Sequence, residues 1–208
     1  MILDALVDYA GLFPPAQLDV PSAVLEYLQA RDGSYAWMLG RFIARQSQLS
    51  RVLAAVPTGG RIALSVILDG GIGDLEWAAG FRRDTRAGSI EVLEIALEPE
   101  SIDSFAKTRG ERGLADIPAF VEVPASAIPA LAQRGLGAKI RCGGLSADAY
   151  PSPQTVASFI ASAHSAGVPF KATAGLHHPV RHYNEAAGVM MHGFLNLLAA
   201  AALARTGA

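Results

Sequence analysis

The sequence is poor in cysteine, which limits the sites that the chain can build alone. Of 208 residues only one, Cys142, is a cysteine. A single thiol excludes an internal disulfide and any metal site with several cysteine ligands from one chain. Because disulfides are typical of oxidising compartments, this composition favours a cytoplasmic protein.

Lysine is almost as scarce, with three lysines against fourteen arginines. Two of the three, Lys139 and Lys171, occupy matching places in two strand-like segments, GAKIRCGG and PFKATAGLHH. An amine can lose its proton near neutral pH and act as a nucleophile or base, whereas a guanidinium stays charged. We therefore expect a lysine-based active site. The alternative is two strand-end lysines that extend into water.

The chain also lacks a strong net charge and a long uninterrupted apolar run. A formal charge of −2 gives no electrostatic footprint for nucleic acid or an anionic membrane, so small molecules are the expected partners. The N-terminus, MILDALVDYAGLFPPA, carries acidic residues where a secretory signal carries basic ones, so we expect no targeting segment. The apolar stretch from Ala186 to Ala204 contains His192 and Asn196, which favours a buried helix over a membrane span. This helix is also the expected contact of a homo-oligomer.

Short apolar runs alternate with amphipathic segments along the chain, which is typical of βα units around a parallel sheet. The predicted strands are Asp8 to Phe13, Ala36 to Ile43, Arg61 to Asp69, Ile90 to Leu97, Ala119 to Val123, Gly137 to Arg141 and Pro169 to Ala174. The predicted helices are Pro21 to Ala30, Ser47 to Ala55, Leu75 to Arg82, Ser101 to Arg109, Ala127 to Arg134 and Pro153 to Ala166, the last with Ser152 as its N-cap.

This pattern predicts an α/β fold of the parallel (β/α) barrel type with seven βα units, in a single domain over residues 1–208. A doubly wound open sheet is the alternative. No eighth strand follows the apolar segment from Phe194 to Ala204. We therefore expect a barrel that closes with seven strands, one that is truncated, or one whose gap a partner chain covers.

Polar side chains alternate with apolar ones along five consecutive predicted strands. In a barrel the outward face packs under helices, while the inward face near the carboxyl ends carries chemistry. The side chains that this rule turns inward are Ser65 and Asp69 in the third strand, Glu94 in the fourth, Glu122 in the fifth, Lys139 and Arg141 in the sixth, and Lys171 and Thr173 in the seventh. We expect the two lysines and the carboxylates of Asp69, Glu94 and Glu122 to be catalytic. The alternative is a structural network of salt bridges.

Two lysines on neighbouring strands suit imine chemistry, because repulsion between like charges favours a neutral amine that can attack a carbonyl. This arrangement, with the segment KATAG from Lys171 to Gly175, resembles class I aldolases of the deoxyribose-phosphate aldolase type. The resemblance implies Lys139 as the Schiff-base residue, Lys171 as its partner and Glu94 as a proton-transfer acid. The sixth strand departs from it, with KIRCGG in place of a run rich in threonine and serine. We expect a lyase that acts on a small, anionic carbonyl compound without a metal cofactor.

A second resemblance leads to a different chemistry. Acidic residues at Asp69, Glu94 and Glu122, followed by Lys139, resemble the pattern of enolase-superfamily barrels, and AKIRCGGL is similar to the sixth-strand region of their dipeptide epimerases. This resemblance implies Mg²⁺ held by the three carboxylates and Lys139 as the base that abstracts a proton beside a carboxylate, in an isomerase or lyase. The capping domain of that superfamily is not found. A non-catalytic ligand-binding subunit is the third alternative.

The loops after the sixth and seventh strands supply the predicted substrate contacts. Gly143 and Gly144 would bring backbone N–H groups to a phosphate or carboxylate beside Arg141, a tight turn being the simpler explanation. The other substrate-binding candidates are Thr173, His178 and His177, the last of which continues the inward parity of Lys171 and Thr173. The spacing of the histidines matches no zinc motif. Cys142 falls on the outward face and is expected in the core. The runs DYAGLFPP, AKIRCGG, FKATAGLHHP and MHGFLN are similar to an uncharacterised bacterial protein family.

Overall fold

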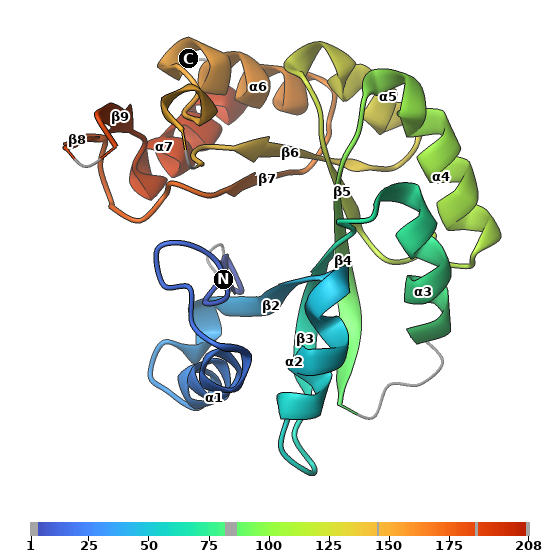
Figure 1. The fold of residues 1–208 in the computed structure, drawn as a ribbon. Helices are drawn as coiled ribbons and strands as arrows, with labels where there is room; N and C mark the ends of the chain where they lie inside the picture. Colours follow the sequence, from blue (N-terminus) through green and yellow to red (C-terminus); the bar gives the residue numbers. More distant parts are fainter. Residues whose placement is uncertain (1–3, 82–86, 145, 186, 207–208) are drawn as a thin grey trace. The chain divides into compact units, whose positions relative to one another are not determined.

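The computed structural model describes residues 4–81, 87–144, 146–185 and 187–206, in which seven parallel strands alternate with helices (Figure 1). The strands are β1 (Val7–Tyr9), β2 (Leu39–Arg45), β3 (Ile62–Ile67), β4 (Gly88–Ala96), β5 (Ala119–Glu122), β6 (Gly137–Arg141) and β7 (Phe170–Thr173). The helices are α1 (Val20–Arg31), α2 (Leu49–Ala55), α3 (Asp74–Phe81), α4 (Ile102–Glu111), α5 (Ile128–Gln133), α6 (Pro153–Ser165) and α7 (Phe194–Thr206). An antiparallel hairpin of β8 (His182–Asn184) and β9 (Val189–Met191) precedes α7.

The predicted α/β fold with a TIM-like parallel sheet is confirmed. The strands follow one another in the sheet in the order in which they occur in the sequence, from β1 to β7. A doubly wound sheet would reverse its strand order, so that alternative is wrong. The sheet is open, because the described chain after β7 forms the separate β8–β9 hairpin in place of an eighth parallel strand.

The predicted strands match the structure closely at β6 and less well at the N-terminus. Residues 137–141 form β6 as expected, whereas β1 already ends at Tyr9 and residues 36–38 form a 3₁₀ turn ahead of β2. The cap of α6 is confirmed, since the Ser152 hydroxyl accepts a hydrogen bond from the amide of Thr155 at 3.1 Å. The predicted end of the third helix, Arg82, lies outside the described residues.

The chain forms two compact units, each with part of the sheet. The first unit comprises residues 1–95 and 105–119, and the second comprises residues 96–104 and 120–208. The single-domain organisation stays a prediction.

The core of the first unit lies between its strands and α1 and α2. Phe42, Leu64 and Val66, which alternate along β2 and β3, are fully buried. Tyr27 of α1 packs edge-on against Phe42, and its hydroxyl donates a hydrogen bond to the Gly40 carbonyl at 2.9 Å. This outward face of the sheet is apolar, as the alternation of the sequence predicts.

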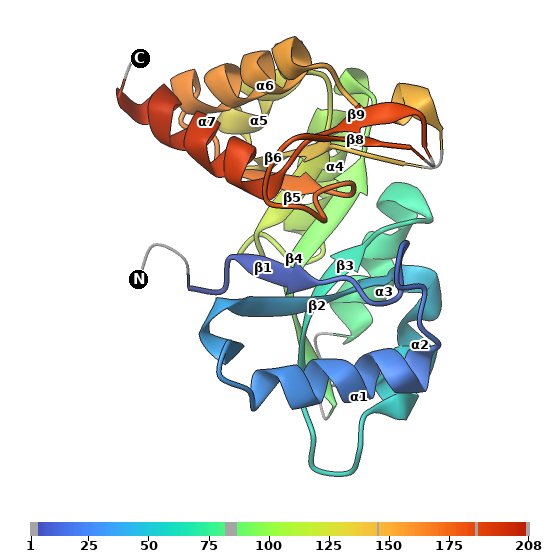
Figure 2. The same cartoon turned by 90° about the vertical axis from the view of Figure 1, so that its left-hand side faces the viewer.

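In the second unit α6 covers the outward face of β6 and contacts α7 (Figure 2). Ala138, Ile140 and Cys142 of the sixth-strand region are buried on this face, with Phe159 from α6. Burial raises the pKa of the Cys142 thiol to about 12. The prediction that this cysteine packs in the core is therefore confirmed.

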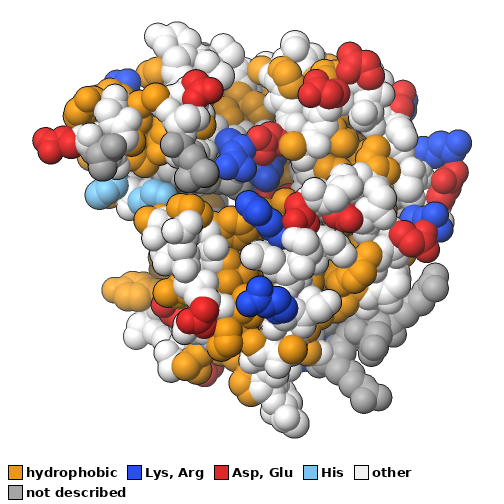
Figure 3. All heavy atoms as spheres, in the orientation of Figure 1, with side chains coloured by type: hydrophobic (Ala, Val, Ile, Leu, Met, Phe, Trp, Pro, Cys, Tyr) orange, Lys and Arg blue, Asp and Glu red, His pale blue; other side chains and the backbone are white. Residues whose placement is uncertain are grey.

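The apolar C-terminal segment forms the expected helix, but its side chains are mostly exposed. Leu197 is buried, whereas a larger apolar set in α7, in the hairpin and in the loop before it is exposed (Figure 3): Val180, Tyr183, Met190, Phe194, Leu195, Leu198 and Leu203. The prediction of a buried helix is thus wrong, and its predicted start at Ala186 lies outside the described residues. None of the helices in the described chain has the length and apolar character that a membrane crossing requires.

Candidate active site

Three ionisable side chains form a row across the sheet of the second unit. Glu122 of β5 is the register partner of Lys139 in β6, which is in turn the register partner of Lys171 in β7. Neighbouring strands lie about 4.8 Å apart, so the three side chains start from adjacent positions on one face. The prediction that β6 and β7 bring two lysines together on this face is confirmed.

Glu122 links the two cations of β6. Its Oε2 lies 3.5 Å from Nζ of Lys139, and its Oε1 lies 4.0 Å from Nε of Arg141. The exposed fraction of the side chain rises from 5% at Lys139 to 28% at Glu122 and 52% at Arg141. The lysine is therefore the buried end of this row of charges, and the arginine is its solvent-accessible end.

A second row lies two residues further along β6 and β7. Arg141 is the register partner of Thr173, and the Thr173 carbonyl accepts a hydrogen bond from the Cys142 amide at 2.7 Å. The Thr173 hydroxyl lies 3.5 Å from the Ile140 carbonyl. Arg141 and Thr173 thus stand beyond the lysines toward the carboxyl ends of the strands, where barrel enzymes bind their substrates.

The glycines after β6 are explained by close packing around the loop that they begin. A Cβ added at Gly143 would lie 2.8 Å from Cα of Gly175, and one added at Gly144 would lie 2.5 Å from Cβ of Ala149. The Gly144 carbonyl also accepts a hydrogen bond from the Tyr150 hydroxyl at 3.1 Å. Close packing against Gly175 and Ala149 therefore accounts for Gly143 and Gly144, and their anion-binding role stays a prediction.

The histidine loop begins with a sharp change of backbone direction. Ala174 and Gly175 both have positive φ, 61° and 67°, so the alternation of β7 does not continue to His177. Strand parity therefore gives no basis for placing His177 on the face of Lys171. Burial, and then the charge of His178, lower the pKa of His177.

The remaining histidines make contacts within the same unit. The rings of His178 and His182 lie with centroids 4.0 Å apart. His192 is 5% exposed, and its Nε2 lies 2.7 Å from the Pro151 carbonyl, which ties the start of α7 to the start of α6. The substrate-binding roles of His177 and His178 stay predictions.

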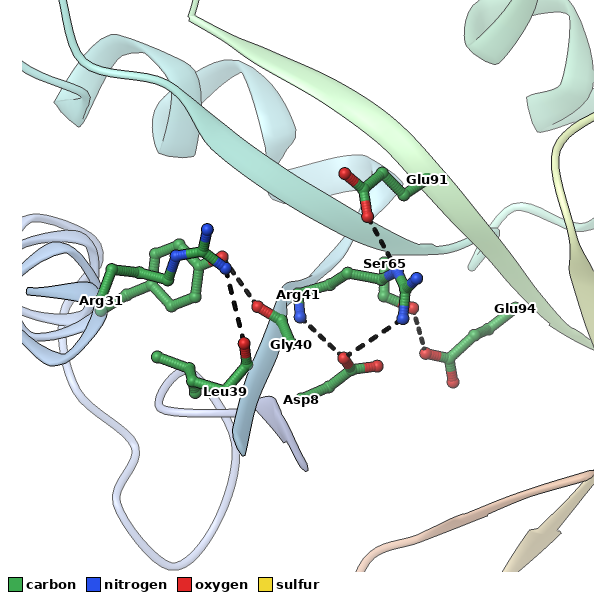
Figure 4. Close-up of polar contacts among 9 residues, drawn as sticks. Asp8, Arg31, Leu39, Gly40, Arg41, Ser65, Glu91 and Glu94 are labelled. Atoms are coloured by element: carbon green, nitrogen blue, oxygen red, sulfur yellow. Dashed lines mark hydrogen bonds and ion pairs between the residues drawn. The ribbon is translucent and has the colours of Figure 1, made fainter. Parts of the chain in front are cut away.

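The first unit holds the predicted inward pair of Ser65 and Glu94 (Figure 4). The Ser65 hydroxyl donates a hydrogen bond to Oε1 of Glu94 at 2.6 Å, and the two residues are 0% and 1% exposed. Their contact confirms that both side chains leave the sheet on the same face. A carboxylate this deeply buried requires hydrogen-bond donors, one of which Ser65 supplies.

Arg41 of β2 lies between two carboxylates of the same unit (Figure 4). Its backbone amide donates a hydrogen bond to Oδ1 of Asp8 at 2.7 Å, and its Nε lies 3.1 Å from Oε2 of Glu91. Gly40 makes room for this arrangement, because an added Cβ would collide with Oδ1 of Asp8. Glu91 is the extra residue of a β-bulge, since Leu64 pairs with Ile90 and the next residue of β3 pairs with Val92.

Asp69 lies in the loop after β3. Its carboxylate accepts hydrogen bonds from the amide of Ser47, at 3.1 Å, and from the Ser47 hydroxyl. Burial raises the pKa of Asp69, but the hydrogen bonds from Ser47 outweigh that effect and leave the pKa below its ordinary value. Asp69 therefore joins the loops after β2 and β3, and its catalytic role stays a prediction.

The structure groups the predicted carboxylates with different neighbours. Glu122 contacts Lys139 and Arg141, Glu94 contacts Ser65, and Asp69 contacts Ser47. Across residues 4–206, apart from the undescribed positions, no three His, Cys, Asp or Glu residues form a group that could hold a metal ion. The magnesium alternative stays a prediction.

Two residues of the polar network were missed from the sequence. Arg41 alternates with the buried Phe42 in the run LGRFIAR, so the rule that found Lys139 would also have turned Arg41 inward. Glu91 gave no comparable signal, because its position depends on the bulge in β4.

No protein-family model matches the chain, and no curated protein matches it. The function is therefore argued from the chemistry of the side chains.

Proposed function

We propose that the chain is an enzyme that forms an imine between a lysine amine and a small carbonyl compound, as class I aldolases and related lyases do. The observation that carries the proposal is the row of Glu122, Lys139 and Lys171 on adjacent strands. An amine, a second amine and a carboxylate supply the nucleophile and the proton-transfer groups that imine formation and carbon–carbon cleavage need.

The substrate side of the proposal rests on the second row. Arg141 is half exposed and stands with Thr173 at the carboxyl ends of β6 and β7. A guanidinium binds carboxylate and phosphate groups, and a hydroxyl can donate to them. We propose an anionic carbonyl compound as the substrate, with its anionic group toward Arg141.

Reductive trapping tests the proposed function. The protein is incubated with small aldehydes, ketones and keto acids, reduced with sodium borohydride, and examined by intact and peptide mass spectrometry. We expect a substrate-sized secondary-amine adduct at Lys139 or Lys171. Lys107 is the internal control, because its side chain is 77% exposed and lies on α4.

Two outcomes would refute imine chemistry. One is labelling of Lys107 to the same extent as Lys139 and Lys171, which would indicate only surface reactivity. The other is the absence of any adduct across the panel. Retention of the adduct after treatment with EDTA is expected, and its loss would favour the magnesium alternative.

The expected cytoplasmic location and the homo-oligomer through α7 stay predictions. The exposed apolar residues of α7 and the hairpin are a candidate surface for the homo-oligomer. Light scattering of the purified protein tests whether it forms.

A further inference from the structure

We infer that α7 pairs with α7 of a second copy of this chain, in an antiparallel contact about a two-fold axis at Ala199. This inference goes beyond the proposed function and does not depend on it. It gives the expected homo-oligomer a stoichiometry, a contact surface and a geometry.

The two sides of α7 differ in burial but not in polarity. Leu197 is buried, Ala200 and Ala204 on the same side are half-buried, and α6 contacts the helix (Figure 2). The other side is exposed, and its residues recur at helical spacing: Phe194, Leu195, Leu198, Ala199, Ala202 and Leu203. A helix that is apolar all round is typically covered on all sides, so a partner is expected on the exposed side.

Val180 adds an exposed apolar side chain beside the first turn of α7. The Leu195 amide donates a hydrogen bond to the Pro179 carbonyl at 2.9 Å, and the Arg181 amide donates one to Oδ1 of Asn196 at 2.7 Å. These bonds, on either side of Val180 in the sequence, hold it at the start of the helix. We call Val180 and the six exposed apolar residues of the helix the α7 face.

The area of the α7 face matches what a dimer needs. Its five larger side chains are between 36% and 57% exposed. At roughly 150–200 Å² for each such side chain in full exposure, they leave on the order of 400 Å² of apolar surface in water. The exposed alanines Ala199 and Ala202 add to this area. An interface of standard size buries about 800 Å² per partner, of which about 500 Å² is apolar, so the α7 face can supply the apolar part.

The charge of α7 favours a second copy over a charged partner or a membrane surface. Arg205, in the last turn, is the one charged residue of the helix Phe194–Thr206. Helices that lie on membranes are usually rich in lysine and arginine on their polar side. Recognition of a charged protein surface needs complementary charge, which this face does not carry. An uncharged apolar face is complementary to an identical one, and homodimer interfaces are accordingly more apolar than others.

The order of large and small residues favours an antiparallel pair. In a two-fold contact both copies use the same surface. With the axis at Ala199, Leu195 of one copy lies opposite Leu203 of the second copy, and the two copies of Ala199 meet at the centre. Small residues at the centre let the helices approach closely, and the leucine pairs pack on either side of that point.

Light scattering of the unmodified protein and of charged variants tests the contact. We expect twice the 21.7 kDa mass of the chain. Leu195→Glu puts a carboxylate on the α7 face in the first turn, where negative charge suits the helix itself. The dissociation constant of the dimer should rise by about a hundredfold. Leu25→Glu is the matched control, because Leu25 is 55% exposed on α1 of the first unit, and it should leave the mass unchanged.

Cysteine crosslinking tests the antiparallel geometry. Ala199→Cys places two thiols at the two-fold axis, where mild oxidation should join the copies through a disulfide. The native Cys142 is buried and should not compete. Ala157→Cys, at an exposed alanine of α6, is the control and should give little crosslinked dimer on a non-reducing gel.

Each outcome bears on the inference. A monomeric unmodified protein overturns it, and cosedimentation of that monomer with phosphatidylcholine vesicles would assign the α7 face to a lipid surface. A dimer that persists in folded Leu195→Glu also overturns it, and Leu203→Lys replaces this variant if circular dichroism shows that it does not fold. Crosslinking no faster in Ala199→Cys than in Ala157→Cys overturns the antiparallel geometry. None of these results changes the expected imine adducts, so the proposed function is tested separately.

Discussion

The polar networks of the two units have central groups of opposite charge. In the first unit one cation, Arg41, lies between two carboxylates, those of Asp8 and Glu91. In the second unit one carboxylate, that of Glu122, lies between two cations, Lys139 and Arg141. The first network joins side chains of β1, β2 and β4, and the second joins side chains of β5 and β6.

The difference lies in which groups can change protonation state. A guanidinium does not exchange its proton under ordinary conditions, so the first network is suited to hold strands together. The second network contains an amine beside a carboxylate and a second amine at the register position, Lys171. Similar sheet geometry therefore presents a guanidinium between carboxylates in one unit and, in the other, the amines on which the proposed imine chemistry depends.

The largest expected effect comes from removing the cation of the first unit. Arg41→Met leaves the carboxylates of Asp8, whose side chain is 10% exposed, and Glu91 without the guanidinium. We expect a loss of about 3 kcal/mol in the free energy of unfolding, measured with urea. Glu91→Gln is the control, because the side chain of Glu91 is 45% exposed. This variant should lower the free energy of unfolding by about 0.5 kcal/mol. Equal losses would contradict the structural role of Arg41.

Next in size is the hydrogen bond that supports the buried carboxylate. Ser65→Ala removes the donor that lies 2.6 Å from Glu94. We expect a loss of about 2 kcal/mol in urea unfolding, because a hydrogen bond to a buried charged group is removed. The double variant with Glu94→Gln should lose less than the sum of the single variants, and strict additivity would argue against the pair.

Removing the buried cation of the second unit should cost less. Lys139→Met keeps most of the side-chain volume and leaves Arg141 beside Glu122. We expect the free energy of unfolding in urea to fall by about 1 kcal/mol or to rise slightly. If Lys139→Met proves as destabilising as Arg41→Met, the contrast between the two networks fails.

The smallest effect concerns the histidine loop. Burial and the neighbouring His178 lower the pKa of His177, so its NMR titration midpoint should fall below the unperturbed value of about 6.5. As the pH falls, the unfolded chain therefore binds a proton at His177 before the native chain does. The free energy of unfolding should decrease progressively from the unfolded pKa down to the native pKa of this residue. His178→Gln should raise the midpoint of His177, and an unchanged midpoint would exclude the charge of His178 as a cause.

The fold and part of the site could be predicted because both follow from alternation. Ala138, Ile140 and Cys142 pack outward, which leaves Lys139 on the opposite face, where the structure places it beside Glu122. The same rule paired Ser65 with Glu94. In regular strands a period of two residues fixes the face of every side chain.

The errors occur where that period is interrupted. Two consecutive residues with positive φ, Ala174 and Gly175, turn the chain after β7, so the parity assigned to His177 had no physical basis. The β8–β9 hairpin was missed because its strands are only three residues each. The exposure of α7 was missed because an apolar helix indicates a need for burial without showing what covers it.

The bulge at Glu91 determines which change of length β4 can accept. Because Ile90 and Val92 already face consecutive residues of β3, deletion of Glu91 would close the ladder without moving any other pair. Deletion of Val92 or Leu93 would instead send Glu94 to the helix-covered side and break its contact with Ser65. Among length variants of this strand, the one shortened at position 91 should therefore be the one that still folds.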